Sequence, residues 1–318
     1  MVLVLEIIIP IFGFIGLGYL MARTPLLSAE GTKGLSQFVF FCAIPALLFR
    51  AGVRLFAEGA EPVEPGLLIA FFGGGLGIQL SVLLWLWFVR KRPLAEATMA
   101  GLCAAFTNTV MLGLPLSFAL FGDRGLLLTS SVIAVNGLVY YTLTTTLIEL
   151  GQGSGGSPIR NVVSGLAALV KNPILLGMVI GLAWGFAGIP IPGPAAKMID
   201  LLAAAAPPVA LFALGASLVQ FRLAGDLVEA VWITAIKLLV SPALVGAIGY
   251  YLIGLRGDTL ALAIILASTP VGVNPFLIAS RYGVYVQRCG SAILITTALS
   301  VISISVLIAL LAPGGNPP

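Results

Sequence analysis

Two short segments, one in each half of the chain, combine hydroxyl, amide, glycine and proline residues inside apolar stretches. The first runs from Phe106 to Pro115 and the second from Ser268 to Pro275. Proline removes a backbone donor and clashes with the preceding turn, and glycine lowers helix stability, so each segment predicts an interrupted helix. Backbone groups freed inside a membrane persist only where they are buried in protein or line a cavity. These residues therefore predict a binding site for a polar solute.

The candidate substrate-binding residues follow from these two segments. The first segment supplies Thr107, Asn108, Thr109, Gly113 and Pro115, and the second supplies Ser268, Thr269, Pro270, Asn274 and Pro275. The alternative is that each segment is an ordinary proline kink with small-residue packing. Their equivalent places in the two halves favour a site, because paired interrupted helices are typical of secondary transporters.

Lys237 lies deep in another apolar stretch, about ten residues from its end. A lysine at that depth is costly and normally faces a partner or a cavity. One hypothesis is a counter-charge for an anionic substrate or a movable proton carrier. The other is a tether that donates to carbonyl groups freed by the interrupted helices. Both remain open at this stage.

The acidic residues favour an anionic solute. Glu6, Glu96, Glu149 and Glu229 fall near the ends of apolar stretches, so none is a central carboxylate of the kind that carries a cation. Helix N-termini offer partial positive charge and free N–H groups, which suit a carboxylate. The chain has no histidine and three cysteines without metal-ligand spacing, so we expect no metal and no cofactor. Neither a metal cluster nor a nucleophile–base pair is evident, which argues against an enzyme.

The composition defines the class. The 318 residues are 59% hydrophobic and 9% charged, with a mean hydropathy of +1.13, which predicts an all-α polytopic membrane protein. We place ten spans, at about 3–22, 34–53, 66–89, 96–121, 125–149, 166–188, 196–219, 228–253, 259–281 and 286–311.

A repeat organises these spans. The segment from Pro45 to Phe49 recurs 163 residues later from Pro208 to Phe212, with matching glycine and leucine residues after each copy. Five spans in each period force the second copy to be inverted, with crossed broken helices 4 and 9. We expect a first five-helix repeat at 1–150, a flexible cytoplasmic linker at 151–165 and a second repeat at 166–318.

The loop charges predict an orientation. Ten Lys and Arg residues collect on one side of the predicted spans and five on the other, which places the first side in the cytoplasm. An even number of spans then puts both termini outside the cytoplasm, in a cell inner (plasma) membrane.

Short motifs in order along nearly the whole chain resemble the auxin efflux carrier family, which includes plant auxin carriers and bacterial malate or malonate carriers. They are Ile9-Pro10-Ile11-Phe12, Pro45-Ala46-Leu47-Leu48-Phe49, Gly113-Leu114-Pro115-Leu116, Lys171-Asn172-Pro173-Ile174, Phe212-Ala213-Leu214-Gly215, Lys237-Leu238-Leu239-Val240-Ser241-Pro242 and Asn274-Pro275-Phe276. The resemblance implies ten helices in two inverted bundles, a frequent homodimer, and crossover residues at Asn108, Pro115, Asn274 and Pro275. The architecture is similar to that of sodium–proton antiporters and bile acid symporters.

The leading hypothesis is a secondary carrier of small organic anions, such as malate, malonate or auxin-like acids, working by an elevator-type motion. Its expected partners are the anion, membrane lipid, a coupling proton or sodium ion and a second copy of the chain, with no nucleic acid. One alternative is a sodium-coupled symporter of bile-acid-type anions, with oxygens from Thr107, Thr109, Ser268 and Thr269 around the ion. Another is a membrane sensor with a vestigial site that does not transport.

Overall fold

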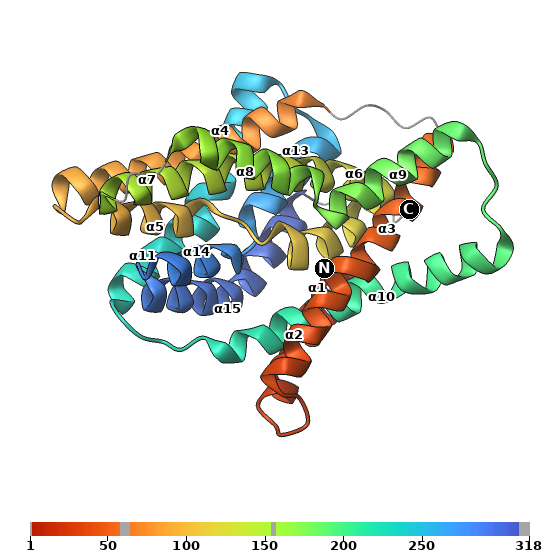
Figure 1. Ribbon diagram of the computed structural model, residues 1–318, viewed down its shortest axis with the longest axis horizontal. Coiled ribbons are helices and arrows are strands. Elements are labelled where there is room, and N and C mark those ends of the chain that lie inside the picture. Colours follow the sequence, from red (N-terminus) through yellow and green to blue (C-terminus); the bar gives the residue numbers. More distant parts are fainter. Residues whose placement is uncertain (1, 58–63, 154–156, 312–318) are drawn as a thin grey trace. The chain divides into compact units, whose positions relative to one another are not determined.

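A computed structural model describes residues 2–57, 64–153 and 157–311, and every regular element in these ranges is a helix (Figure 1). Seven of these helical stretches are long and apolar enough to cross a membrane, and three shorter apolar helices lie at 94–105, 173–187 and 257–268. The expectation of a helical, multi-pass membrane protein is therefore confirmed.

The helices form two compact units, each assembled from both halves of the sequence. Unit 1 comprises Met1–Val63, Thr109–Ala134 and Ala168–Gln220, and unit 2 comprises Glu64–Asn108, Val135–Ala167 and Phe221–Pro318. Each unit therefore contains residues from both predicted repeats, 1–150 and 166–318. The division into these two repeats stays a prediction from the sequence.

Unit 1 is built around four helices and a core of aliphatic side chains. Its elements are α1 (Val2–Ala22), α2 (Ala29–Phe38), the π-helical turn η1 (Val39–Ala43), α3 (Ile44–Ala57), the π-helical turn η3 (Thr109–Gly113), most of α6 (Leu114–Asn136), α9 (Pro173–Ala187), α10 (Gly193–Ser217) and the 3₁₀ turn η5 (Leu218–Gln220). Helix α3 packs against α9, and α1 against α10. Leu47 and Leu48 of α3 are fully buried in a core shared with Leu114, Met178 and Ala210.

Close backbone contacts join these helices in reciprocal pairs. Gly18 of α1 lies so close to the Phe212 carbonyl of α10 that a Cβ atom there would overlap it. Gly181 of α9 meets the Phe49 carbonyl of α3 in the same way. Gly181 comes 163 positions after Gly18, and Phe212 comes 163 positions after Phe49. The two contacts are therefore related to each other by the same offset of 163 positions, and each joins a helix of the first half to a helix of the second.

A second pair obeys the same relation. A Cβ on Gly215 would overlap the Ile15 carbonyl, and one on Gly52 would come 2.9 Å from the Met178 carbonyl. Gly215 comes 163 positions after Gly52, and Met178 comes 163 positions after Ile15. Small residues allow this close approach of helix backbones, which is the usual means of association in a membrane.

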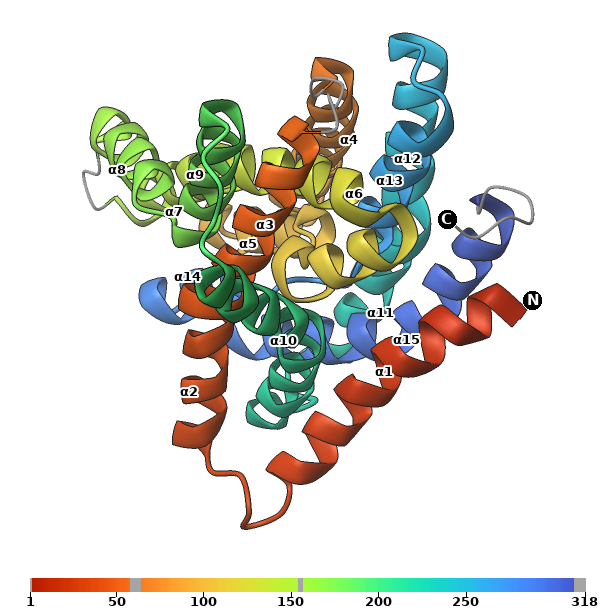
Figure 2. The same ribbon diagram turned by 90° about the vertical axis from the view of Figure 1, so that its right-hand side faces the viewer.

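Unit 2 carries the remaining helices. They are α4 (Pro65–Leu84), η2 (Trp85–Val89), α5 (Leu94–Ala105), η4 (Gly137–Tyr141), α7 (Thr142–Gln152), most of α8 (Pro158–Val170), α11 (Leu227–Ala235), η6 (Ile236–Val240), α12 (Ser241–Ala247), η7 (Ile248–Ile253), α13 (Gly257–Ser268), α14 (Asn274–Tyr282) and α15 (Val286–Leu311). Helix α12 runs beside α13 (Figure 2), and α11 and α14 both pack on α15 (Figure 1).

Spans 96–121 and 259–281, which were expected to be interrupted, are each divided, into α5 with η3–α6 and into α13 with α14. Within α6, Gly122 has a φ of +56°, so a turn separates two helical parts. The expected span 166–188 is not one helix: it contains the end of α8, up to Val170, and then α9 from Pro173.

Residues 158–165 of the expected flexible linker form the start of helix α8, while residues 154–156 lie outside the described ranges. Asn161 of α8 donates through Nδ2 to Glu149 Oε2 of α7 at 3.0 Å. The Tyr282 hydroxyl of α14 donates to Glu149 Oε1 at 2.9 Å. Burial and this hydrogen bond raise the pKa of Tyr282 to about 12, so the hydroxyl stays a donor at neutral pH. The start of α8 is thus held against α7 by a hydrogen bond, although the glycines of segment 151–165 predicted a flexible linker.

The reciprocal glycine contacts predict a specific loss of stability. Gly18→Ala and Gly181→Ala each place a methyl group against a backbone carbonyl, so we expect each to destabilise the protein by about 1–3 kcal/mol. The matched control is Gly13→Ala, on the same helix as Gly18, where an added Cβ meets nothing within 4 Å. Denaturation of the purified variants in detergent measures the effect. Equal stability of the Gly18 and Gly13 variants would contradict the assigned contact.

Candidate functional site

The first interruption follows α5 and consists of three residues. Helix α5 ends at Ala105, and Phe106 is extended, with φ −71° and ψ 127°. Thr107 and Asn108 follow, both buried, before the π-helical turn η3 begins at Thr109. The break is therefore shorter than the stretch that sequence reasoning assigned to it, since Gly113 ends η3 and Pro115 lies in the first turn of α6.

The second interruption separates α13 from α14. Helix α13 ends at Ser268, and Thr269 is extended, with φ −64° and ψ 149°. The Ser268 and Thr269 hydroxyls both donate to carbonyls in the last turn of α13. Ser268 donates to Ile265 at 2.7 Å, and Thr269 donates to Leu266 at 2.9 Å. They satisfy carbonyls at the end of α13, so in this conformation their protons do not point at a solute.

The two interruptions meet inside unit 2. Thr107 and Val271 form an isolated antiparallel bridge, and the Asn108 amide donates to the Pro270 carbonyl at 2.9 Å. Gly272 packs closely here, since a Cβ on it would lie 3.0 Å from the Phe106 ring. Two extended segments from opposite halves of the chain thus pair where their helices are broken.

Lys237 pairs with the end of a broken helix. It lies in the π-helical turn η6, is fully buried, and donates through Nζ to the Ala267 carbonyl of α13 at 2.5 Å. In the ranges that the structure covers, Lys237 forms no ion pair. The observed contact is the tether that sequence reasoning proposed as one of two roles.

Thr296 is a residue of this region that sequence reasoning missed. Its hydroxyl, fully buried in α15, accepts a hydrogen bond from the Val271 amide at 3.2 Å. No local signal marks it, because α15 reads as a continuous apolar helix with scattered hydroxyls.

The structure gathers part of the predicted site. Unit 2 holds Thr107, Asn108, Lys237, Ser268, Thr269, Pro270, Asn274 and Pro275, whereas Thr109, Gly113 and Pro115 belong to unit 1. Asn274 is exposed at the first position of α14, and Pro275 behind it is buried. Within unit 2 the pairing thus joins Thr107 and Asn108 to the segment around Pro270.

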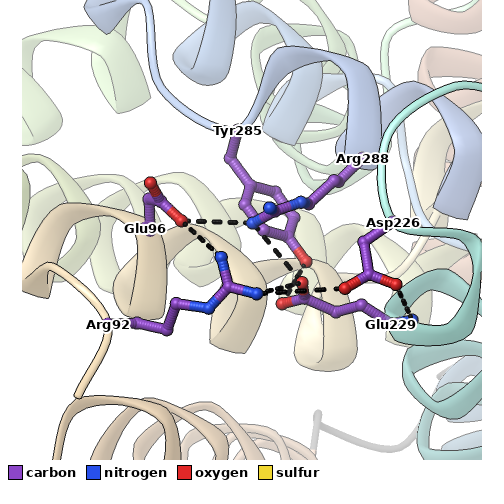
Figure 3. Close-up of polar contacts among 6 residues, drawn as sticks. All are labelled: Arg92, Glu96, Asp226, Glu229, Tyr285 and Arg288. Carbon is purple, nitrogen blue, oxygen red and sulfur yellow. Dashed lines mark hydrogen bonds and ion pairs between the residues drawn. The ribbon is translucent and has the colours of Figure 1, made fainter. Parts of the chain in front are cut away.

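A charged cluster, also missed from sequence, ties together the starts of α5, α11 and α15 (Figure 3). Arg288 NH1 lies 3.1 Å from Glu96 Oε2 and 3.4 Å from Glu229 Oε2. Arg92 contacts the same two carboxylates, at 3.3 Å and 3.7 Å, and also Asp226 at 3.9 Å. Arg92 and Glu96 are four residues apart, but the three helix starts that the cluster joins are far apart in sequence, so spacing alone does not bring them together.

Glu229 is the buried centre of this cluster, with its side chain 5% exposed. Its Oε1 accepts from the Tyr285 hydroxyl at 2.9 Å, and its backbone amide donates to Asp226 Oδ1 at 3.1 Å. Burial, and to a lesser degree the neighbouring Cys103 and Glu229, raise the pKa of Tyr285, so the hydroxyl stays protonated and donates. Glu229 thus connects the three helix starts, with Oε1 hydrogen-bonded to Tyr285 and Oε2 facing the guanidinium groups of Arg92 and Arg288.

Comparison with known proteins assigns the family. A family model described as "Membrane transport protein" matches residues 3–157 and 157–308. The chain belongs to this family of transporters. A protein of Rhizobium meliloti (strain 1021) named "Putative malonate transporter" is 30% identical to the transporter over 319 residues, covering 98% of this chain and 97% of its own.

More distant relatives of the transporter carry related names. "Uncharacterized transporter YfdV" of Escherichia coli (strain K12) is 26% identical over 300 residues, which is 92% of each chain. "Auxin efflux carrier component 8" of Arabidopsis thaliana is 22% identical over 338 residues, covering 90% of this chain and 91% of its own. The predicted resemblance to auxin efflux carriers is confirmed, and these relatives are named as transporters rather than enzymes.

The transporter should depend on Lys237 for stability. Lys237→Met keeps the length of the side chain but leaves a buried carbonyl of α13 without this donor, so apo stability should fall by about 1–3 kcal/mol, together with transport. Unfolding of the apo variant, compared with Lys197→Met at an exposed site, measures this. An unchanged or raised apo stability with loss of substrate binding would show instead that Lys237 contacts the substrate directly.

The charged cluster of the transporter predicts coupling between Glu229 and Tyr285. Glu229→Gln and Tyr285→Phe should each lower stability, and the double variant should lose less than the sum, with a coupling free energy of about 1 kcal/mol. Glu6→Gln at an exposed position is the control for loss of a carboxylate charge. Additive effects in the double-mutant cycle would argue against the contact in Figure 3.

Proposed function

We propose that this transporter is a secondary carrier of small organic anions, with dicarboxylates such as malonate as the first candidates, working by elevator-type alternating access. The observation that carries the proposal is the pairing of two interrupted helices at Thr107 and Val271 inside an apolar protein. Interrupted helices of this kind bind substrates in secondary transporters, through half-helix ends and unwound backbone. The relative named as a malonate transporter supports the choice of a dicarboxylate.

The polar groups around the pairing suit an anion. The N-terminus of α14, at Asn274, offers partial positive charge and an exposed amide side chain. The basic side chain of Lys237 reaches the neighbouring end of α13. Among the described residues, no group of three or more His, Cys, Asp or Glu side chains forms a metal site. These groups favour a carboxylate, which accepts hydrogen bonds from amide and hydroxyl donors.

Two finer features belong to the same proposal. The four glycine contacts related by 163 positions support ten helices in two inverted repeats, with Asn108, Pro115, Asn274 and Pro275 at the crossover. The homodimer, the extracytoplasmic termini and the inner (plasma) membrane location are proposed from the family resemblance and from the loop charges.

A flux panel in proteoliposomes tests the proposed function. Purified protein is reconstituted, and uptake of labelled malonate, malate, a monocarboxylate and a bile acid is measured with imposed proton, sodium and voltage gradients in turn. Malonate or malate uptake above empty liposomes supports an organic-anion carrier, and the gradient that drives it identifies the coupling ion. Sodium-driven bile acid uptake alone would favour the symporter alternative, and binding without flux would indicate a sensor.

The amide side chains should matter for this flux. Asn108→Ala and Asn274→Ala remove amides that can donate to a carboxylate, and each should lower malonate uptake about tenfold or more while leaving folded protein. Gln287→Ala, which removes an exposed amide at the start of α15, is the control. Wild-type uptake in either asparagine variant would refute the role of that residue.

A further inference from the structure

The hydroxyl of Thr296 joins two elements that are separate in sequence. It accepts from the Val271 amide of the segment between α13 and α14 at 3.2 Å, and it donates to the Ala292 carbonyl of its own helix at 2.6 Å. Its neighbour Thr297 is also buried, but its hydroxyl donates within its own helix, to the Ile293 carbonyl of α15 at 2.7 Å. Thr296 is therefore the tether, and Thr297 is a matched hydroxyl without that function.

The Val271 amide needs this partner because the helix is broken. In a continuous α-helix it would donate to the carbonyl four residues earlier, that of Ala267. That carbonyl accepts from Lys237 instead, and Pro270 has no amide hydrogen. Two backbone groups that would normally bond each other are thus each satisfied by a side chain from another element.

Val271 in turn positions Thr107, its partner in the antiparallel bridge. Thr107 is 2% exposed, and its hydroxyl oxygen has no hydrogen-bond partner in the described part of the chain. Most buried hydroxyls are satisfied, and an unsatisfied one is costly. The Thr107 hydroxyl is therefore a buried group without a partner at the place where the two broken helices pair. Such a group is suited to hydrogen-bond a ligand.

We infer that Thr296 is a positioning residue for substrate binding: through Val271 it holds Thr107 where the Thr107 hydroxyl donates to a carboxylate oxygen of the transported anion. This inference rests on the proposed organic-anion function. Thr296 itself does not touch the anion, because its oxygen is already engaged with Val271 and Ala292. Its effect on affinity must therefore pass through Thr107.

Binding of malonate to purified variants tests this dependence. Thr296→Val should weaken malonate binding about tenfold, Thr296→Ser should restore it, and Thr297→Val should stay within about twofold of the wild type. Thr107→Val should also weaken binding about tenfold while leaving apo stability equal or raised. Adding Thr296→Val to Thr107→Val should produce no further loss. Equal affinity in Thr296→Val and wild type, or a full additional loss in the double variant, overturns the inference.

Amide exchange in the apo protein provides a second readout that needs no substrate. The Val271 amide lies in the segment from Ser268 to Val273, and its exchange is resolved from that of its neighbours by comparing overlapping peptides that end on either side of Val271. Exchange at this amide should be about tenfold faster in Thr296→Val than in Thr296→Ser or Thr297→Val. Unchanged exchange would refute the tether even if Thr296→Val fails to bind. Faster exchange with no binding of malonate by the wild type would refute the substrate role while sparing the tether.

Discussion

Every backbone group that a broken helix frees must find a partner, because an apolar surrounding offers no water to replace it. The arrangement of unit 2 follows from this constraint. The Ala267 carbonyl accepts a hydrogen bond from Lys237. The Val271 amide donates to the Thr296 hydroxyl, and the Asn108 amide donates to the Pro270 carbonyl. Helices η6 and α15 must therefore lie beside the break, and the two extended segments must pair. The same constraint explains why a lysine is retained deep in an apolar helix.

Each unit combines buried apolar side chains, close glycine contacts and polar pairs. In unit 1, glycines meet backbone carbonyls, and Arg50 pairs with Asp200. In unit 2, Gly101 meets the Gln79 carbonyl, and Glu229 and Glu149 form ion pairs and hydrogen bonds at helix ends. An elevator mechanism of the kind proposed needs one part that keeps its internal packing and another that keeps its site intact. Each unit has an internal basis for that rigidity.

The sequence predicted features that depend on local chemistry. Proline and glycine, together with polar residues, indicated the interrupted segments 106–115 and 268–275, since proline and glycine disfavour the interior of a helix. It did not predict Thr296 or the cluster around Glu229. Thr296 contacts Val271, 25 positions away, and the Glu229 side chain contacts residues 56 or more positions away. Helix α8 was read as linker because glycines dominate the preceding segment, whereas its docking partner Glu149 lies on another helix. Contacts between elements that are distant in sequence produce no periodic pattern in the sequence.

The glycine contacts of unit 1 involve carbonyl oxygens, so the neighbouring helices recognise the path of the backbone and not the identity of its side chains. Substitutions at Phe49 or Phe212 leave those oxygens in place. The glycine on the opposite helix, by contrast, cannot gain a Cβ without crowding that oxygen. The close approach of these helices is therefore sensitive to any side chain added at the glycine, and insensitive to the side chain of the residue that supplies the oxygen.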